Sequence, residues 1–116
     1  MYVIKRMTGN LVVSFEYSGN EPNNTWLLEK TYVKARNRYC ERVKADLEKL
    51  DGAFDFSGKS GKDYLAYMVE NMNLYAEKEY ASSILYPLLF KRFFVMDDLK
   101  FCAELPDGSV MSISVI

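Results

Sequence analysis

The stretch LVVSFEY, residues 11–17, alternates large apolar side chains with smaller or polar ones at a period of two. Such alternation predicts a β-strand with one buried face. A strand-like run over residues 2–7 precedes it, and the turn sequence Thr8-Gly9-Asn10 separates the two runs. The N-terminal part of the chain therefore predicts a β-hairpin.

A second hairpin pattern ends the sequence. Apolar residues alternate over 99–105, Pro106-Asp107-Gly108 predicts a turn, and residues 110–116 form the returning strand. If both hairpins join one antiparallel sheet, one alternating set of side chains from each must face the helices. The set is Leu11, Val13, Phe15, Phe101, Ala103 and Leu105.

Two helices are predicted between the hairpins. The first covers residues 26–50, has Tyr32 and Tyr39 on its flank, and ends at Asp51-Gly52. Its predicted core face consists of Val33, Cys40, Val43, Leu47 and Leu50. The second starts at the capping sequence Ser60-Gly61-Lys62-Asp63 and reaches residue 82. Its predicted core face consists of Tyr64, Leu65, Met68, Met72, Tyr75, Ala76 and Tyr80.

Residues 84–96 are apolar on every side, which predicts a segment surrounded by protein. We interpret it as a short buried helix with Pro87 in its first turns, and a buried strand is the alternative. The order β-β-α-α-(α)-β-β predicts an α+β fold, in which an antiparallel sheet of about four strands packs on two or three helices. A length of 116 residues predicts a single domain, 1–116.

The composition argues against several classes of function. The 15 basic and 16 acidic residues nearly cancel, so no bulk attraction to nucleic acid or to an anionic membrane is expected. We expect no signal peptide and no membrane-spanning segment, and we predict a cytoplasmic location. The sequence contains no histidine, which removes the usual zinc sets and nucleophile–base pairs. We therefore predict a protein that is not an enzyme and that holds no metal or cofactor.

Two further features have structural interpretations. Cys40 and Cys102 are far apart in the sequence, and we expect both to be reduced, packed thiols. The sequence SGKSGKD, residues 57–63, is similar to a phosphate-binding loop. However, Phe56 stands where that loop needs glycine and Asp63 where it needs a hydroxyl, so a capped loop is predicted.

Charge is segregated between the two predicted helices. Basic residues exceed acidic ones over 30–50, and acidic residues exceed basic ones over 63–80. On the first helix, a basic stripe at i, i+4 spacing consists of Lys30, Lys34, Arg38 and Arg42. This stripe either contacts an anion such as phosphate or belongs to a solvated face of mixed charge.

The second helix carries another apolar line away from its core face, formed by Tyr67, Leu74 and Ala81. Either residues 84–96 cover this line or it is left for a partner. In the second case the partner-binding residues are Tyr67, Glu70, Asn71, Leu74, Glu77 and Lys78. Their acidic members favour a partner with a basic surface.

A buried ion pair between the helices is also predicted. Arg36 and Glu79 fall near the centres of the two predicted core faces. In an antiparallel pair of helices they would lie side by side, and pairing would offset the cost of burying each charge.

The general character of the chain is similar in type to that of small inhibitors and antidotes, including toxin-immunity proteins and phage-encoded anti-defence proteins. This resemblance implies a protein-binding module that occludes the surface of a partner. A nucleic-acid-contacting or nucleic-acid-mimicking protein is the alternative, and a small enzyme of unrecognised type is the third. Whether the chain forms a homo-oligomer is left open by the sequence.

Overall fold

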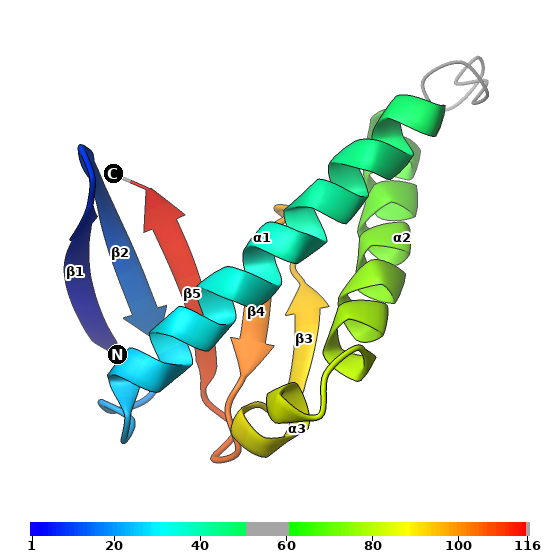
Figure 1. Ribbon diagram of the computed structural model, residues 1–116. Coiled ribbons are helices and arrows are strands. Elements are labelled where there is room, and N and C mark those ends of the chain that lie inside the picture. Colours follow the sequence, from blue (N-terminus) through cyan, green and yellow to red (C-terminus); the bar gives the residue numbers. More distant parts are fainter. Residues whose placement is uncertain (51–60, 116) are drawn as a thin grey trace.

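The computed structural model describes residues 1–50 and 61–115 (Figure 1). Its elements are, in order, β1 (Tyr2–Thr8), β2 (Leu11–Tyr17), α1 (Thr25–Leu50), α2 (Gly61–Ala81), α3 (Leu85–Leu89), β3 (Arg92–Val95), β4 (Phe101–Glu104) and β5 (Val110–Val115). The predicted α+β class is confirmed, with five strands where about four are predicted. The predicted helix stop at Asp51-Gly52, Ser60 of the predicted cap and most of the 57–63 loop lie outside the described residues.

One antiparallel sheet contains all five strands in the order β1-β2-β5-β4-β3. The two terminal hairpins meet where β2 pairs with β5, with Phe15 opposite Ile113 and Tyr17 opposite Met111. The prediction that both hairpins join one sheet is therefore confirmed.

The side chains predicted to face the helices are buried with one exception. Leu11 is 56% exposed, so its predicted burial is wrong. The reason is its position at the turn end of β2, which lies away from the path of α1 across the sheet (Figure 1).

Helix α1 crosses one face of the sheet diagonally (Figure 1). Its buried apolar residues follow the spacing of a single helix face and are Leu28, Tyr32, Ala35 and Tyr39. The core face predicted for this helix is wrong by roughly one residue around the helix. Cys40 is exposed, and Val33 and Val43 are only half-buried. The side chains of Leu47 and Leu50 lie outside the description.

The two tyrosines occupy the centre of this face because the sheet accommodates both their rings and one hydroxyl. The Tyr32 hydroxyl donates a hydrogen bond to the carbonyl oxygen of Phe101 at 2.7 Å. The ring of Tyr39 stacks on Phe101, with 4.7 Å between ring centroids. Large aromatic surfaces contribute more to burial than the smaller valine and cysteine side chains do.

Helix α2 packs against α1 and along the outer edge of β3. On its core face Met72 and Ala76 are buried, while Met68, Tyr75 and Tyr80 are partly buried against the core, as predicted. The predicted core positions Tyr64 and Leu65 have side chains outside the description. Asn73 uses its side-chain amide to bond both backbone groups of Val95 on β3.

Residues 84–96 form the short helix α3 and then the strand β3, so each interpretation holds for a part of the segment. The prediction that the whole segment is surrounded by protein is wrong. Tyr86, Phe90, Phe93 and Val95 are buried, but Ile84, Leu85, Pro87 and Leu88 are exposed. The reason is that so short a helix packs only one side on the core, and Tyr86 with Phe90 occupies that side.

The predicted β4–β5 turn is confirmed, whereas the β3–β4 turn extends to Leu99, where the sequence predicts a strand. Asp98 lies in the β3–β4 turn, where its Oδ1 accepts a hydrogen bond from the backbone N–H of Lys100 at 3.2 Å. Leu99, predicted to start the last hairpin, lies in this turn with a φ of 63°. Gly108, with a φ of 89°, follows Pro106 and Asp107 in the β4–β5 turn.

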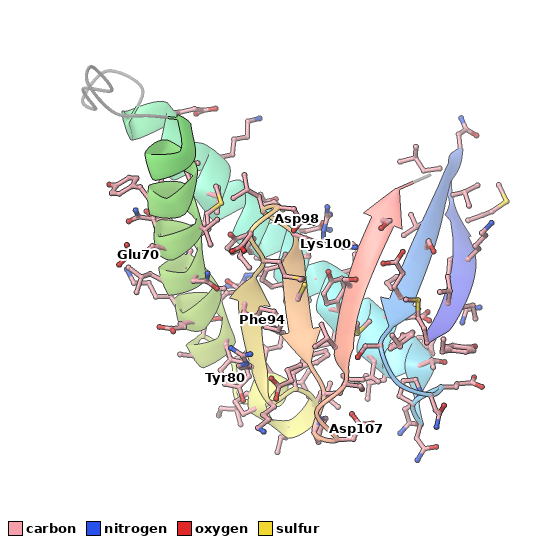
Figure 2. The ribbon with its side chains drawn as sticks, turned by 180° about the vertical axis from the view of Figure 1, so that it is seen from behind. Glu70, Tyr80, Phe94, Asp98, Lys100 and Asp107 are labelled. Carbon is pink, nitrogen blue, oxygen red and sulfur yellow. The ribbon has the colours of Figure 1, made fainter. Side chains whose placement is uncertain are left out.

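The other face of the sheet carries no helix among the described residues. Figure 2 shows this face from behind, with Phe94 and Lys100 on it. The guanidinium of Arg92 lies 4.4 Å from the centre of the Phe94 ring, and Lys100 Nζ lies 3.1 Å from Glu16 Oε2. No helix in the described part of the chain combines the length and apolar character needed to cross a membrane.

Candidate functional site

The outward face of α2 carries a row of exposed side chains, which we call the α2 ridge: Glu70, Leu74, Glu77, Lys78 and Ala81. The spacing of three and four residues places them on one side of the helix. Leu74 is 51% exposed at the middle of the row. Glu70 projects outward from the helix when the molecule is seen from behind (Figure 2).

Two of the predicted partner-binding residues lie beside the ridge instead of on its crest. Tyr67 and Asn71 are both half-buried. Together with Val43 and Asp46 of α1, they line a pocket between the two helices. The side chain of Asn71 also donates a hydrogen bond to the carbonyl oxygen of Tyr67 at 2.8 Å, one turn earlier.

The segment after Pro87 passes α2 on another side and leaves Leu74 exposed. It meets α2 at Asn73, through Val95, and at Tyr80, whose hydroxyl donates to the carbonyl oxygen of Phe90 at 3.0 Å. Successive residues of a helix point about 100° apart, so the contact at Asn73 is turned away from Leu74.

A second exposed apolar group follows directly on the C-terminal end of the ridge. We call it the α3 turn, and it consists of Ile84, Leu85, Pro87 and Leu88. Ile84 is 88% exposed, Leu88 72% and Leu85 45%. Sequence reasoning missed this group because it equated an apolar segment with a buried one. The only signal in the sequence is that the segment is too short and too apolar to bury every side of one helical turn.

The basic stripe of α1 is not a row of free cations. Lys30 Nζ lies 5.0 Å from the ring centre of Trp26, and Arg38 Nε lies 3.6 Å from Glu79 Oε1. Arg42 is half-buried, and its positive charge acts to lower the pKa of Tyr75. A hydrogen bond with Asp46 outweighs this effect, so the pKa of Tyr75 is raised overall. Lys34 is exposed. Three of the four side chains therefore have interactions within the chain, and the predicted anion-contacting stripe stays a prediction.

The predicted ion pair involves the right acid and the wrong base. Glu79 is only 1% exposed, and its partner is Arg38, not Arg36. The buried face of α1 is rotated from the predicted one, which changes the positions of both arginines relative to α2. Arg38 therefore takes the place predicted for Arg36 beside Glu79. The hydroxyl of Tyr86 donates to Glu79 Oε1 at 3.4 Å. Glu79 Oε2 has no hydrogen-bond partner among residues 1–50 and 61–115.

A second buried acid, which sequence reasoning missed, joins α1 to the start of the sheet. Arg6 Nε donates to Glu29 Oε2 at 3.1 Å, and the Tyr17 hydroxyl donates to Glu29 Oε1 at 3.4 Å. Burial, with the nearby Glu29 charge, raises the pKa of Tyr17. This cluster is structural, since its groups satisfy one another.

The cysteines and the acids in the described part of the chain form no further candidate site. Cys102 is buried, as predicted, and burial raises the pKa of its thiol to about 11. Cys40 is exposed, which corrects the prediction of a packed thiol. Within the described ranges, no group of three or more acidic or cysteine side chains is placed to hold a metal ion.

Comparison of the chain with protein-family models, curated proteins and solved structures finds no match. The α2 ridge and the α3 turn are therefore assessed from their own chemistry.

Proposed function

We propose that this chain is a small protein-binding module that docks on a partner protein through the α2 ridge and the α3 turn, and so occludes the partner's surface. The observation that carries the proposal is the exposure of Ile84 at 88% and of Leu88 at 72%. Burying one such side chain contributes about 1.5 to 3 kcal/mol. A group of them on the surface marks an interaction site more often than isolated ones do.

The polar residues of the ridge supply the orientation. Glu70, Glu77 and Lys78 flank Leu74, so an apolar strip is bordered by charge, as at the centre and rim of protein interfaces. The two acids favour a partner with a basic surface and speed the encounter. Such a mode of action fits a cytoplasmic inhibitor or antidote of the toxin-immunity or anti-defence type.

Contacts in α1 favour this function over nucleic-acid binding. Phosphate recognition needs several free cations in one row. Arg38 is instead held by the buried Glu79, and Lys30 lies against Trp26. An enzyme has less support, because no histidine is present and the described part of the chain holds no group of acids or cysteines that could bind a metal ion.

Affinity capture from the lysate of the native host tests the proposal. We expect the Ile84→Ser/Leu88→Ser variant to lose the captured protein while keeping its melting temperature. A matched control, Leu11→Ser/Met96→Ser, also replaces two exposed apolar side chains, which are 56% and 48% exposed. It should keep the partner. Equal capture by both variants would refute the proposal.

A salt titration of the captured complex separates the two kinds of partner. An apolar-centred interface should weaken little between 50 and about 200 mM salt, whereas contacts to several phosphates lose roughly a thousandfold or more in that range. Loss of the complex with the steep phosphate slope would favour nucleic acid over a protein partner.

A further inference from the structure

The two edges of the sheet are treated differently by the fold. At the β3 edge, Asn73 of α2 bonds the N–H and the C=O of Val95, and the Tyr80 hydroxyl bonds the C=O of Phe90. The other edge is β1, which lies at the far side of the sheet from α2 (Figure 1). In the described part of the chain, β2 is the only strand that pairs with β1.

The hairpin geometry fixes which backbone groups of β1 point outward. Thr8 pairs with Leu11 across the two-residue turn, where Gly9 has a φ of 63°. A two-residue turn closes on a hydrogen-bonded pair, and these pairs alternate along an antiparallel ladder. The N–H and C=O groups of Val3, Lys5 and Met7 therefore face away from β2. All three residues are exposed, Val3 at 46% and Met7 at 74%.

We propose that a second copy of this chain occupies the edge, with the two β1 strands antiparallel about a two-fold axis at Ile4. Val3 then lies opposite Lys5 of the second copy, and Tyr2 opposite its Arg6. Backbone hydrogen bonds between the outward groups of the two strands supply the contact, as in other strand-addition interfaces.

Charge disfavours the registers with the axis at Lys5 or Arg6, and an axis at Val3 would pair only residues 1–5. Residues whose N–H and C=O groups face outward can pair only with such residues of the second strand. The two-fold axis must therefore lie at a residue and not between two residues. An axis at Lys5 would place Lys5 opposite Lys5, and an axis at Arg6 would place Arg6 opposite Arg6. Like charges directly opposite each other destabilise a strand pair. The register at Ile4 has no such pair and uses residues 1–7 of both strands.

The second copy also explains why, among the described residues, α2 caps the β3 edge and no element caps the β1 edge. Pairing of β1 with β1 joins the two sheets, and both outer edges of the joined sheet are then β3, each closed by Asn73. A two-fold pair is a closed assembly, so no edge is left to template further growth. An extended segment from another protein would leave its own outer edge open.

Sedimentation velocity of the full chain over a range of concentrations tests the proposal. We expect a monomer–dimer equilibrium. Val3→Glu should tighten the dimer and Val3→Lys should weaken it, each by roughly 3- to 10-fold in Kd, because position 3 meets Lys5 twice per dimer. Since Val3 is partly exposed, both variants should fold, which circular dichroism verifies.

A backbone variant tests the hydrogen bonds separately. Lys5→Pro removes an outward N–H that β2 does not use, so the fold should persist while the dimer is lost. Lys5→Thr, which keeps the N–H, should still dimerise. Three results would overturn the proposal: a monomer at every concentration, a dimer whose Kd shifts in the same direction in both Val3 variants, or a dimer abolished by Ile84→Ser/Leu88→Ser. A monomer that binds an extended peptide along β1 is one form of the first result.

Discussion

Asn73 of α2 takes the place of a missing strand neighbour for Val95 at the edge of β3. Its Oδ1 accepts a hydrogen bond from the Val95 N–H at 2.8 Å, and its Nδ2 donates to the Val95 carbonyl oxygen at 3.1 Å. The same Nδ2 also donates to the carbonyl oxygen of Val69 at 3.0 Å. The α2 ridge lies on the side of the helix opposite the buried Met72 and Ala76, so this attachment leaves it exposed.

Replacement of Asn73 tests this attachment. Asn73→Ala leaves both edge groups of the buried Val95 without their partner, so the free energy of unfolding should fall by about 1 to 3 kcal/mol. Asn71→Ala is the matched control, since Asn71 bonds only within its own helix. It should cost less than about 0.5 kcal/mol. Urea unfolding measures both, and equal losses would contradict the role of Asn73.

The pair of Arg38 and Glu79 should behave as one unit. Arg38→Met strands a buried carboxylate, and because Arg38 is half-exposed we expect a loss of about 1 to 3 kcal/mol. Adding Glu79→Gln should recover a part of that loss, giving a coupling of about 1 kcal/mol in a double-mutant cycle. Arg36→Met is the control and should have little effect. Additive losses would show that the two side chains do not interact.

Two buried tyrosines on α1 offer a matched comparison. Tyr32→Phe removes the hydrogen bond to Phe101 and should cost about 1 kcal/mol. The Tyr39 hydroxyl is buried without a partner among the described residues, so Tyr39→Phe should be neutral or stabilising. Thermal unfolding of both variants measures the difference. A greater loss in Tyr39→Phe would show that its hydroxyl is paired.

Alkaline pH should destabilise the protein. Burial raises the pKa of Cys102 to about 11 and also raises the pKa of Tyr17, Tyr32 and Tyr39. The unfolded chain loses the same protons near pH 8.5 for the thiol and 10 for phenols, so the folded state binds more protons above about pH 8.5. The stabilising contribution is complete below that pH and is lost as pH rises through the folded pKa values.

A urea titration at several pH values checks this dependence. The contribution of Cys102 should fall by about 1 kcal/mol per pH unit at most between pH 9 and 11. Cys102→Ala should flatten that part of the curve and leave the steeper loss above pH 10, which the tyrosines cause. Stability that rises from pH 8.5 to 10 would contradict the assignment.

The hairpins could be predicted from the sequence because a period of two is a local property of the strand. The buried face of α1 could not be predicted in this way, since a tyrosine side chain suits either the flank of a helix or the core. The answer depends on the carbonyl of Phe101, 69 residues away from Tyr32. The strand β3 was hidden for a related reason: an all-apolar segment has no period, and pairing with β4 decides its form.

The candidate site could be predicted only in part. The sequence reveals the line through Leu74, because it is a second apolar row on a helix that needs only one apolar row to pack on the core. Whether Ile84 and Leu88 are covered depends on how much protein surrounds one short helix, and the shortness of this apolar segment is the only sign of it in the sequence. The exchange of Arg36 for Arg38 followed from the error in the face of α1.

Hydroxyl-radical footprinting of the free chain and of its captured complex tests the proposed docking surface most directly. We predict that Leu74, Ile84 and Leu88 lose labelling in the complex. Trp26 and Met7, which are 69% and 74% exposed on other parts of the surface, serve as internal controls and should label equally in both states. Protection of Trp26 and α1, with unchanged labelling of Ile84 and Leu88, would contradict the proposal that the α2 ridge and α3 turn bind the partner.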